Sequence, residues 1–79
     1  MAQTTLVEEW FTKGLVLLES QEYEKAIMAF EQAIKIVPQF AEAWAKKGEA
    51  LNALDRLNES ICAYDEAIKI NPSLIEAWL

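Results

Sequence analysis

Residues 7–40 of the chain read VEEWFTKGLVLLESQEYEKAIMAFEQAIKIVPQF, and residues 41–74 read AEAWAKKGEALNALDRLNESICAYDEAIKINPSL. The two stretches have the same length and align without a gap. Average residue usage would give about two identities by chance. Instead, twelve residues of the first stretch recur 34 positions later, namely Glu8, Trp10, Lys13, Gly14, Leu17, Ile27, Ala29, Ala33, Ile34, Lys35, Ile36 and Pro38. The chain therefore contains a tandem repeat with a period of 34 residues.

A third copy begins near the end of the sequence. Trp10, Trp44 and Trp78 keep the 34-residue spacing, so residues 75–79 start another repeat that stops at Leu79. We divide the chain into an N-terminal cap segment (1–6), a first repeat (7–40), a second repeat (41–74) and the truncated start of a third (75–79). Because three or more repeats are usually needed for stability, we expect this 79-residue chain to self-associate as a homodimer.

Each repeat is expected to form two helices joined by a turn. Trp10, Gly14 and Leu17 recur at i, i+4 and i+7, which places them on one helical face. The same spacing in the second half of the repeat relates Ala26, Phe30, Ala33 and Ile34. Pro38 and Pro72 disfavour helix at their own and the preceding position, so each repeat ends there. The predicted class is all-α, a tandem array of helix-turn-helix units.

The starts of the repeats and their glycines carry further signals. Thr5 and Ser73 each begin an S/T-x-x-E capping box, and Gln39 stands in the equivalent slot of the second repeat. These slots predict helix starts. Glycine inside a helix costs about 1 kcal/mol relative to alanine, so Gly14 and Gly48 need another reason. We expect the helices to approach closely there, with two aromatic residues packing on the bare backbone, Phe30 on Gly14 and Tyr64 on Gly48.

Composition excludes several classes of function. Seven basic residues stand against thirteen acidic ones, a net charge of −6, which opposes binding to nucleic acid and to anionic membrane surfaces. No apolar run approaches the roughly 18 residues of a membrane span, and the acidic N-terminus does not resemble a signal peptide. The single cysteine permits no internal disulfide and fits a cytoplasmic location.

No catalytic or metal-binding pattern is present in the sequence. The chain has no histidine, which removes Ser-His and Cys-His catalysis and histidine-ligated metals, and no cofactor is expected. We interpret Cys62 as a small buried or half-buried filler. The i, i+4 pairs Glu31–Lys35 and Asp65–Lys69 are expected to be surface ion pairs. The tryptophans are expected in the core, since interleaved basic residues are lacking.

The pattern resembles the tetratricopeptide repeat (TPR) family, over residues 7–79. The matching residues are Trp10, Gly14, Ala26, Phe30, Ala33 and Pro38 in the first repeat, and Trp44, Gly48, Tyr64, Ala67 and Pro72 in the second. The chain departs from the family at three positions of the helices. Lysine replaces the leucine before each glycine, leucine replaces the tyrosine three residues after it, and Ser60 takes a small-residue position.

The turns between the helices also depart from the family, because neither contains the usual glycine. They read Ser20-Gln21-Glu22 and Leu54-Asp55-Arg56. Since nothing forbids one continuous helix from Glu49 to Asn71, two alternatives remain for the second repeat. Either residues 54–57 form a slightly strained turn around Asp55, or they straighten and produce a domain swap.

The resemblance implies a non-catalytic module that binds a helix or peptide of a partner protein in a groove lined by the first helix of each repeat. Mapped onto this sequence, the groove residues are Glu8, Phe11, Thr12, Leu15, Leu18 and Glu19, with Glu42, Ala45, Lys46, Glu49, Asn52 and Ala53. Phe11, Leu15 and Leu18 form a second apolar stripe beside the core stripe. It either contacts the partner, or is covered by the chain itself or by a second copy.

Two further expectations concern binding partners. The family's carboxylate clamp for acidic tails requires Lys and Asn where this chain has Phe11 and Leu15, so we expect no binding of acidic chaperone tails. The chain is also consistent with two other roles, a self-associating fragment of a longer array or a regulatory arm of a larger enzyme. The uncapped second helix of repeat two is expected to expose Ile61 or Ile68.

Overall fold

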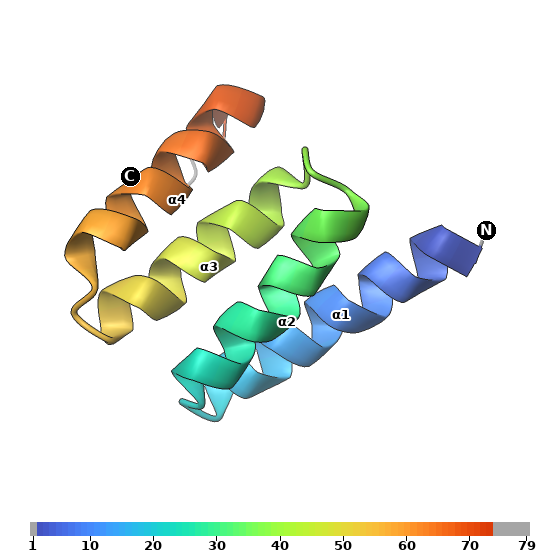
Figure 1. Cartoon of the computed structure of the whole chain (residues 1–79), viewed down its shortest axis with the longest axis horizontal. Coiled ribbons are helices and arrows are strands. Elements are labelled where there is room, and N and C mark those ends of the chain that lie inside the picture. Colours follow the sequence, from blue (N-terminus) through green and yellow to red (C-terminus); the bar gives the residue numbers. More distant parts are fainter. Residues whose placement is uncertain (1, 74–79) are drawn as a thin grey trace.

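The computed structural model describes residues 2–73, and this part of the chain consists of four α-helices without strands (Figure 1). The helices are α1 (Ala2–Glu19), α2 (Tyr23–Ile36), α3 (Ala41–Ala53) and α4 (Leu57–Ile70). Each repeat supplies one helical hairpin, α1 with α2 and α3 with α4. The predicted all-α class and the helix-turn-helix organisation are therefore confirmed.

The two hairpins stack through their inner helices. α1 packs on α2, α2 on α3 and α3 on α4, with a smaller contact between α1 and α3. In Figure 1 the helices follow one another across the molecule, with α1 and α4 at opposite edges. Each of these two edge helices carries exposed apolar side chains, Val16 on α1 and Leu57 and Ile61 on α4.

The prolines end the helices as predicted, whereas the first predicted helix start is wrong and the second is displaced by one residue. α2 ends at Ile36 and α4 at Ile70, in each case two residues before proline. α1 already begins at Ala2, so Thr5 lies inside it. α3 begins at Ala41 with Phe40, not Gln39, at its N-cap, and no side chain caps it. The third repeat, with Trp78 and most of its capping box, lies outside the described residues.

The turn between α1 and α2 and the turn between α3 and α4 have the same backbone geometry, although neither contains glycine. Gln21 and Asp55 have φ angles of 66° and 62°, in the left-handed region. The N–H of Glu22 donates to the carbonyl of Leu17 (2.9 Å), and the N–H of Arg56 donates to that of Leu51 (2.9 Å). This is the Schellman pattern, which satisfies the last carbonyls of a helix but usually employs glycine. The structure thus has the strained turn at Asp55, and the straightened alternative is not adopted.

The predicted contact between glycine and an aromatic ring is present in both hairpins. A Cβ placed on Gly14 would lie 2.5 Å from Cε1 of Phe30, and one placed on Gly48 would lie 3.2 Å from Cδ1 of Tyr64. Phe30 is fully buried (0 % exposed), and Tyr64 is half-buried. Close approach of the two helices in each hairpin therefore depends on the absence of a side chain at these two glycines.

Sequence reasoning did not anticipate two hydrogen bonds that hold the helices together. The buried Ser60 donates its hydroxyl to the carbonyl of Gly48 (2.8 Å), linking α4 to α3. Nε1 of Trp44 donates to the carbonyl of Pro38 (3.0 Å), linking α3 to the loop that precedes it. Trp44 and Trp10 are both half-buried and pack against core clusters, as the sequence predicted.

Candidate functional site

The predicted groove residues occupy α1 and α3, and the structure leaves most of them accessible. The exposed members are Glu8, Thr12, Glu19, Glu42, Glu49, Asn52 and Ala53, and the half-buried members are Phe11, Leu15, Leu18 and Lys46. We call this surface the α1–α3 face. Ala45 is only 1 % exposed, so its side chain is not available to a partner in this structure. The remaining residues present side chains from two helices that touch each other.

The apolar stripe on α1 is partly used by the chain's own core. The ring of Phe11 lies 4.7 Å from that of Phe40 and 5.8 Å from that of Phe30, measured between centroids. Leu18 packs against the cluster built around Ile27. Among the described residues, Leu15 belongs to neither core cluster. The alternative in which the chain covers its own stripe therefore applies to Phe11 and Leu18, whereas Leu15 is half-buried outside both clusters.

Negative charge dominates the α1–α3 face. Its exposed acidic members are Glu8, Glu19, Glu42 and Glu49, and Lys46 is the one basic residue among the residues that define it. Nζ of Lys46 lies 3.3 Å from Oε2 of Glu49, so its charge is shared with a neighbouring carboxylate. A face with this balance favours a positively charged ligand.

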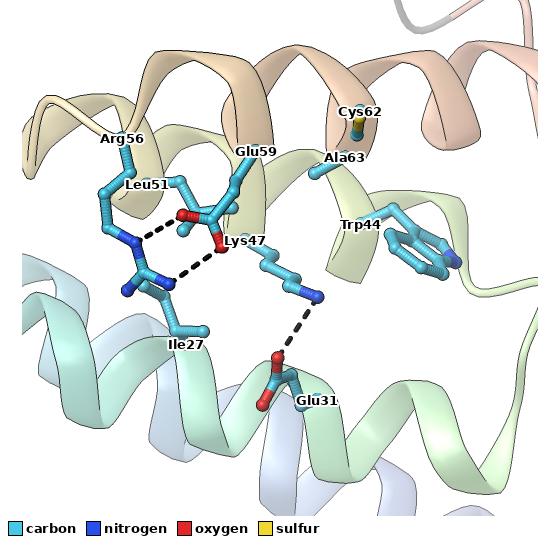
Figure 2. A pocket seen from close by; sticks show the side chains of 9 residues that line it. All are labelled: Ile27, Glu31, Trp44, Lys47, Leu51, Arg56, Glu59, Cys62 and Ala63. Carbon is cyan, nitrogen blue, oxygen red and sulfur yellow. Dashed lines mark hydrogen bonds and ion pairs between the residues drawn. The ribbon is translucent and has the colours of Figure 1, made fainter.

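A second hollow lies between α2 and α4, with α3 as its floor (Figure 2). We call it the α2–α4 groove. Its volume is about 250 Å³, and its lining residues are Ile27, Glu31, Trp44, Lys47, Leu51, Arg56, Glu59, Cys62 and Ala63. The sequence did not indicate it, because its residues come from both repeats, and helical spacing within α2, α3 and α4 does not say which faces of these helices meet.

The charged side chains of the groove neutralise one another. Lys47 reaches from α3 to Glu31 on α2, with Nζ 3.2 Å from Oε2 (Figure 2). Arg56 donates two hydrogen bonds to Glu59, from Nε (2.7 Å) and Nη2 (2.8 Å). These hydrogen bonds lower the pKa of Glu59 and raise that of Arg56. Because its charges are already paired and its volume lies below the roughly 300 Å³ of typical ligand pockets, the groove is better explained as packing between repeats.

Three sequence predictions about these surfaces need correction. Glu31 pairs with Lys47 across the repeat boundary, not with Lys35 on its own helix. Lys69 lies nearest to Glu66, with Nζ 3.7 Å from Oε2, not to Asp65. Cys62 is exposed at the rim of the groove, because the helix face that carries it points away from α3. The predicted exposure of Ile61 is confirmed.

The described residues offer little basis for metal binding or catalysis. Residues 6–73 contain no group of three or more acidic or cysteine side chains that could hold a metal ion. None of the helices in the described part is long and apolar enough to cross a bilayer. Burial raises the pKa of the Tyr64 phenol, and this follows from its packing on Gly48.

Stacked helical hairpins with a 34-residue period define a helical-repeat protein, a class that presents surfaces to other macromolecules. The sequence profile of the tetratricopeptide repeat family matches residues 11–75. The chain therefore belongs to the tetratricopeptide repeat family, whose members are generally non-catalytic modules for protein–protein interaction. No curated protein matched the chain in a comparison of sequences.

Proposed function

We propose that the chain binds a basic, amphipathic segment of a partner protein on the α1–α3 face. The observation that carries this proposal is that Glu8, Glu19, Glu42 and Glu49 are exposed on the α1–α3 face, which also carries Leu15, a half-buried apolar side chain outside both core clusters. A segment with one apolar and one basic side would place its apolar residues on Leu15 and its cations among the carboxylates. The net charge of −6 supports the same preference.

The same features oppose the other ligand classes. Acidic tails and nucleic acids would meet four carboxylates and one shared lysine on this face. We propose that the chain itself catalyses no reaction and acts in the cytoplasm, where its exposed Cys62 would remain reduced.

Peptide binding to the full chain tests the proposal. The probe is a fluorescent helical peptide with one leucine face and one lysine face, and its counterpart carries glutamate in place of lysine. We expect binding of the lysine peptide alone, weakened by salt, and weakened about tenfold by Leu15→Ser because a buried apolar contact is lost.

The matched control is Val16→Ser, which removes a neighbouring side chain that points to a different side of α1. It should leave peptide affinity unchanged. Equal affinity of the wild-type chain and the Leu15→Ser variant for the lysine peptide would exclude the α1–α3 face as its site.

A further inference from the structure

The interface between the two repeats is built from α2 and α3. On α2 the participating residues are Tyr23, Ile27, Glu31 and Ile34, and on α3 they include Lys47, Ala50 and Leu54. At its centre Ile27, Ala50 and Leu51 form a buried cluster, beside which the Lys47–Glu31 ion pair spans the helices. In this interface the second helix of repeat one, α2, packs against the first helix of repeat two, α3.

The repeat positions of these residues recur on both edges of the array. Counting 34 residues forward from α2 gives Leu57, Ile61, Asp65 and Ile68 on α4, and counting 34 back from α3 gives Lys13, Val16 and Ser20 on α1. We call Leu57, Ile61 and Asp65 the α4 face, and Lys13, Val16 and Ser20 the α1 face. The α4 face is therefore equivalent to the side of α2 that packs on α3. The α1 face is equivalent to the side of α3 that packs on α2.

Both faces are uncovered where their counterparts are buried. Ile27 is 7 % exposed, whereas Ile61, its counterpart on α4, is 59 % exposed. Ala50 is fully buried, whereas Val16, its counterpart on α1, is 58 % exposed. Leu57 is also exposed. The equivalent residues all lie on α-helices. Their exposed fractions differ because Ile27 and Ala50 lie between α2 and α3, whereas no other described helix covers Ile61 or Val16.

The charges on the two faces are complementary and already positioned. Asp65 keeps the acidic character of Glu31, and Lys13 repeats Lys47. Within the described part of the chain, neither Asp65 nor Lys13 takes part in an ion pair. Nζ of Lys13 lies 5.2 Å from the ring centroid of Trp10, matching the 5.1 Å between Lys47 and Trp44. The α1 face therefore presents its lysine in the pose that the inter-repeat interface uses.

We propose that a second copy of the chain docks its α1 face on the α4 face of the first, head to tail. This contact buries Ile61 against Val16 and pairs Asp65 with Lys13, as Glu31 pairs with Lys47 within one chain. In this contact residues 6–11 of the incoming copy stand at the repeat positions that residues 40–45 hold within one chain. The interface is heterologous, which leaves a free face at each end and allows further copies to add.

This interaction is independent of the proposed function because it uses another side of α1. Successive residues are about 100° apart around a helix, so Val16 and Leu15 point in different directions. Partner binding on the α1–α3 face and stacking through the α1 face can therefore be lost separately.

Charge reversal in the full chain tests the proposal. Sedimentation velocity from micromolar to millimolar concentration should show the average mass of the wild type rising past two copies. Lys13→Asp and Asp65→Lys each create a like-charge pair and should weaken association at least about tenfold. An equimolar mixture of the two variants should regain the wild-type association. In that mixture the lysine introduced on the α4 face of one variant meets the aspartate introduced on the α1 face of the other, and the native Lys13 of the first variant meets the native Asp65 of the second.

Controls separate this contact from general effects of charge. Glu42→Lys makes the same charge change as Asp65→Lys on the α1–α3 face and should leave association unchanged, and circular dichroism checks that every variant stays helical. A wild type that remains a single copy at all concentrations, or that stops at two, overturns the proposal. So does a mixture of the two variants that associates no better than either variant alone.

Discussion

The second helices of the two repeats, α2 and α4, share the sequence IKI at their ends and meet the same kind of glycine, yet they lie in different surroundings. α2 packs on both α1 and α3, whereas the main contact of α4 with another described helix is with α3. Ile27 is consequently buried and Ile61 exposed. In this array, the exposed fraction of an isoleucine depends on whether another helix packs against it, because the residue type is the same at both positions.

The two hairpins also differ in how tightly their helices meet. Phe30 packs closer to Gly14 than Tyr64 packs to Gly48, and its ring is fully enclosed by α1 and its neighbours. Repeat two compensates with the Ser60–Gly48 hydrogen bond, where repeat one has the buried Ala26. Substitutions at the two glycines, at Ser60 and at Arg56 test this difference.

The largest difference is expected from placing alanine at the two glycines. Gly14→Ala should destabilise the chain by about 2 kcal/mol, because the new Cβ would meet three atoms of the enclosed Phe30 ring within 2.9 Å. Gly48→Ala should change stability by less than about 1 kcal/mol, because the half-buried Tyr64 ring can shift and alanine favours the helix. Urea unfolding measures both variants. Equal losses would mean that the two hairpins are packed alike.

A smaller effect is expected from removing the hydroxyl of Ser60. Ser60→Ala deletes a buried hydrogen bond that repeat one lacks, and should cost about 1 kcal/mol in the free energy of unfolding. The matched control is Ser20→Ala, since the hydroxyl of Ser20 also donates to a helical carbonyl, that of Val16 (2.9 Å), but at an exposed position. If both variants unfold at the same urea concentration, the buried hydrogen bond of Ser60 stabilises the chain no more than the exposed one of Ser20.

The smallest effect concerns the ion pairs that open the second helices. Repeat one has Glu22 with Lys25, and repeat two has Arg56 with Glu59 in the reverse order. Arg56 lowers the pKa of Glu59 in the folded chain below its ordinary value of 4.5. The unfolded chain therefore binds more protons around this pH, so the contribution to stability is present above pH 4.5 and is lost as the pH falls through the lowered pKa.

Arg56→Gln should flatten the acid side of the stability curve, measured by urea unfolding at a series of pH values. Arg56→Lys keeps the charge but not the two parallel hydrogen bonds, and should give an intermediate slope. Both side chains are exposed to solvent, so the change should be small and should shrink in salt. An unchanged slope in Arg56→Gln would show that the pair is not maintained in solution.

Much of the fold could be predicted from the sequence because the decisive signals lie within single repeats. The structure confirms the helical hairpins of the 34-residue repeat and the helix ends before Pro38 and Pro72. It also confirms that each glycine contacts an aromatic ring. The helix starts were harder to predict, because no side chain caps α2, α3 or α4. In addition, α1 begins at Ala2, five residues before the repeat boundary.

The candidate site was harder to predict, because amphipathic patterns do not say which element covers a face. Phe11 and Leu18 were grouped with Leu15 by spacing alone, but the first two pack against the core. Ala45 was placed on the surface and is buried. Cys62 was placed near the core and is exposed, since only the position of α3 decides which side of α4 is enclosed.

The sequence by itself determined the repeat period, the helical hairpins and the residues at which each hairpin closes. These depend on contacts a few residues apart or on backbone preferences that each side chain carries with it. Tertiary structure alone decided that Lys47 pairs with Glu31, that Ser60 bonds to Gly48 and that Ile61 is left exposed while Ile27 is buried. Those outcomes require two helices to be placed in space, because an ion pair, a buried hydrogen bond and an exposed fraction each depend on where the neighbouring helix lies.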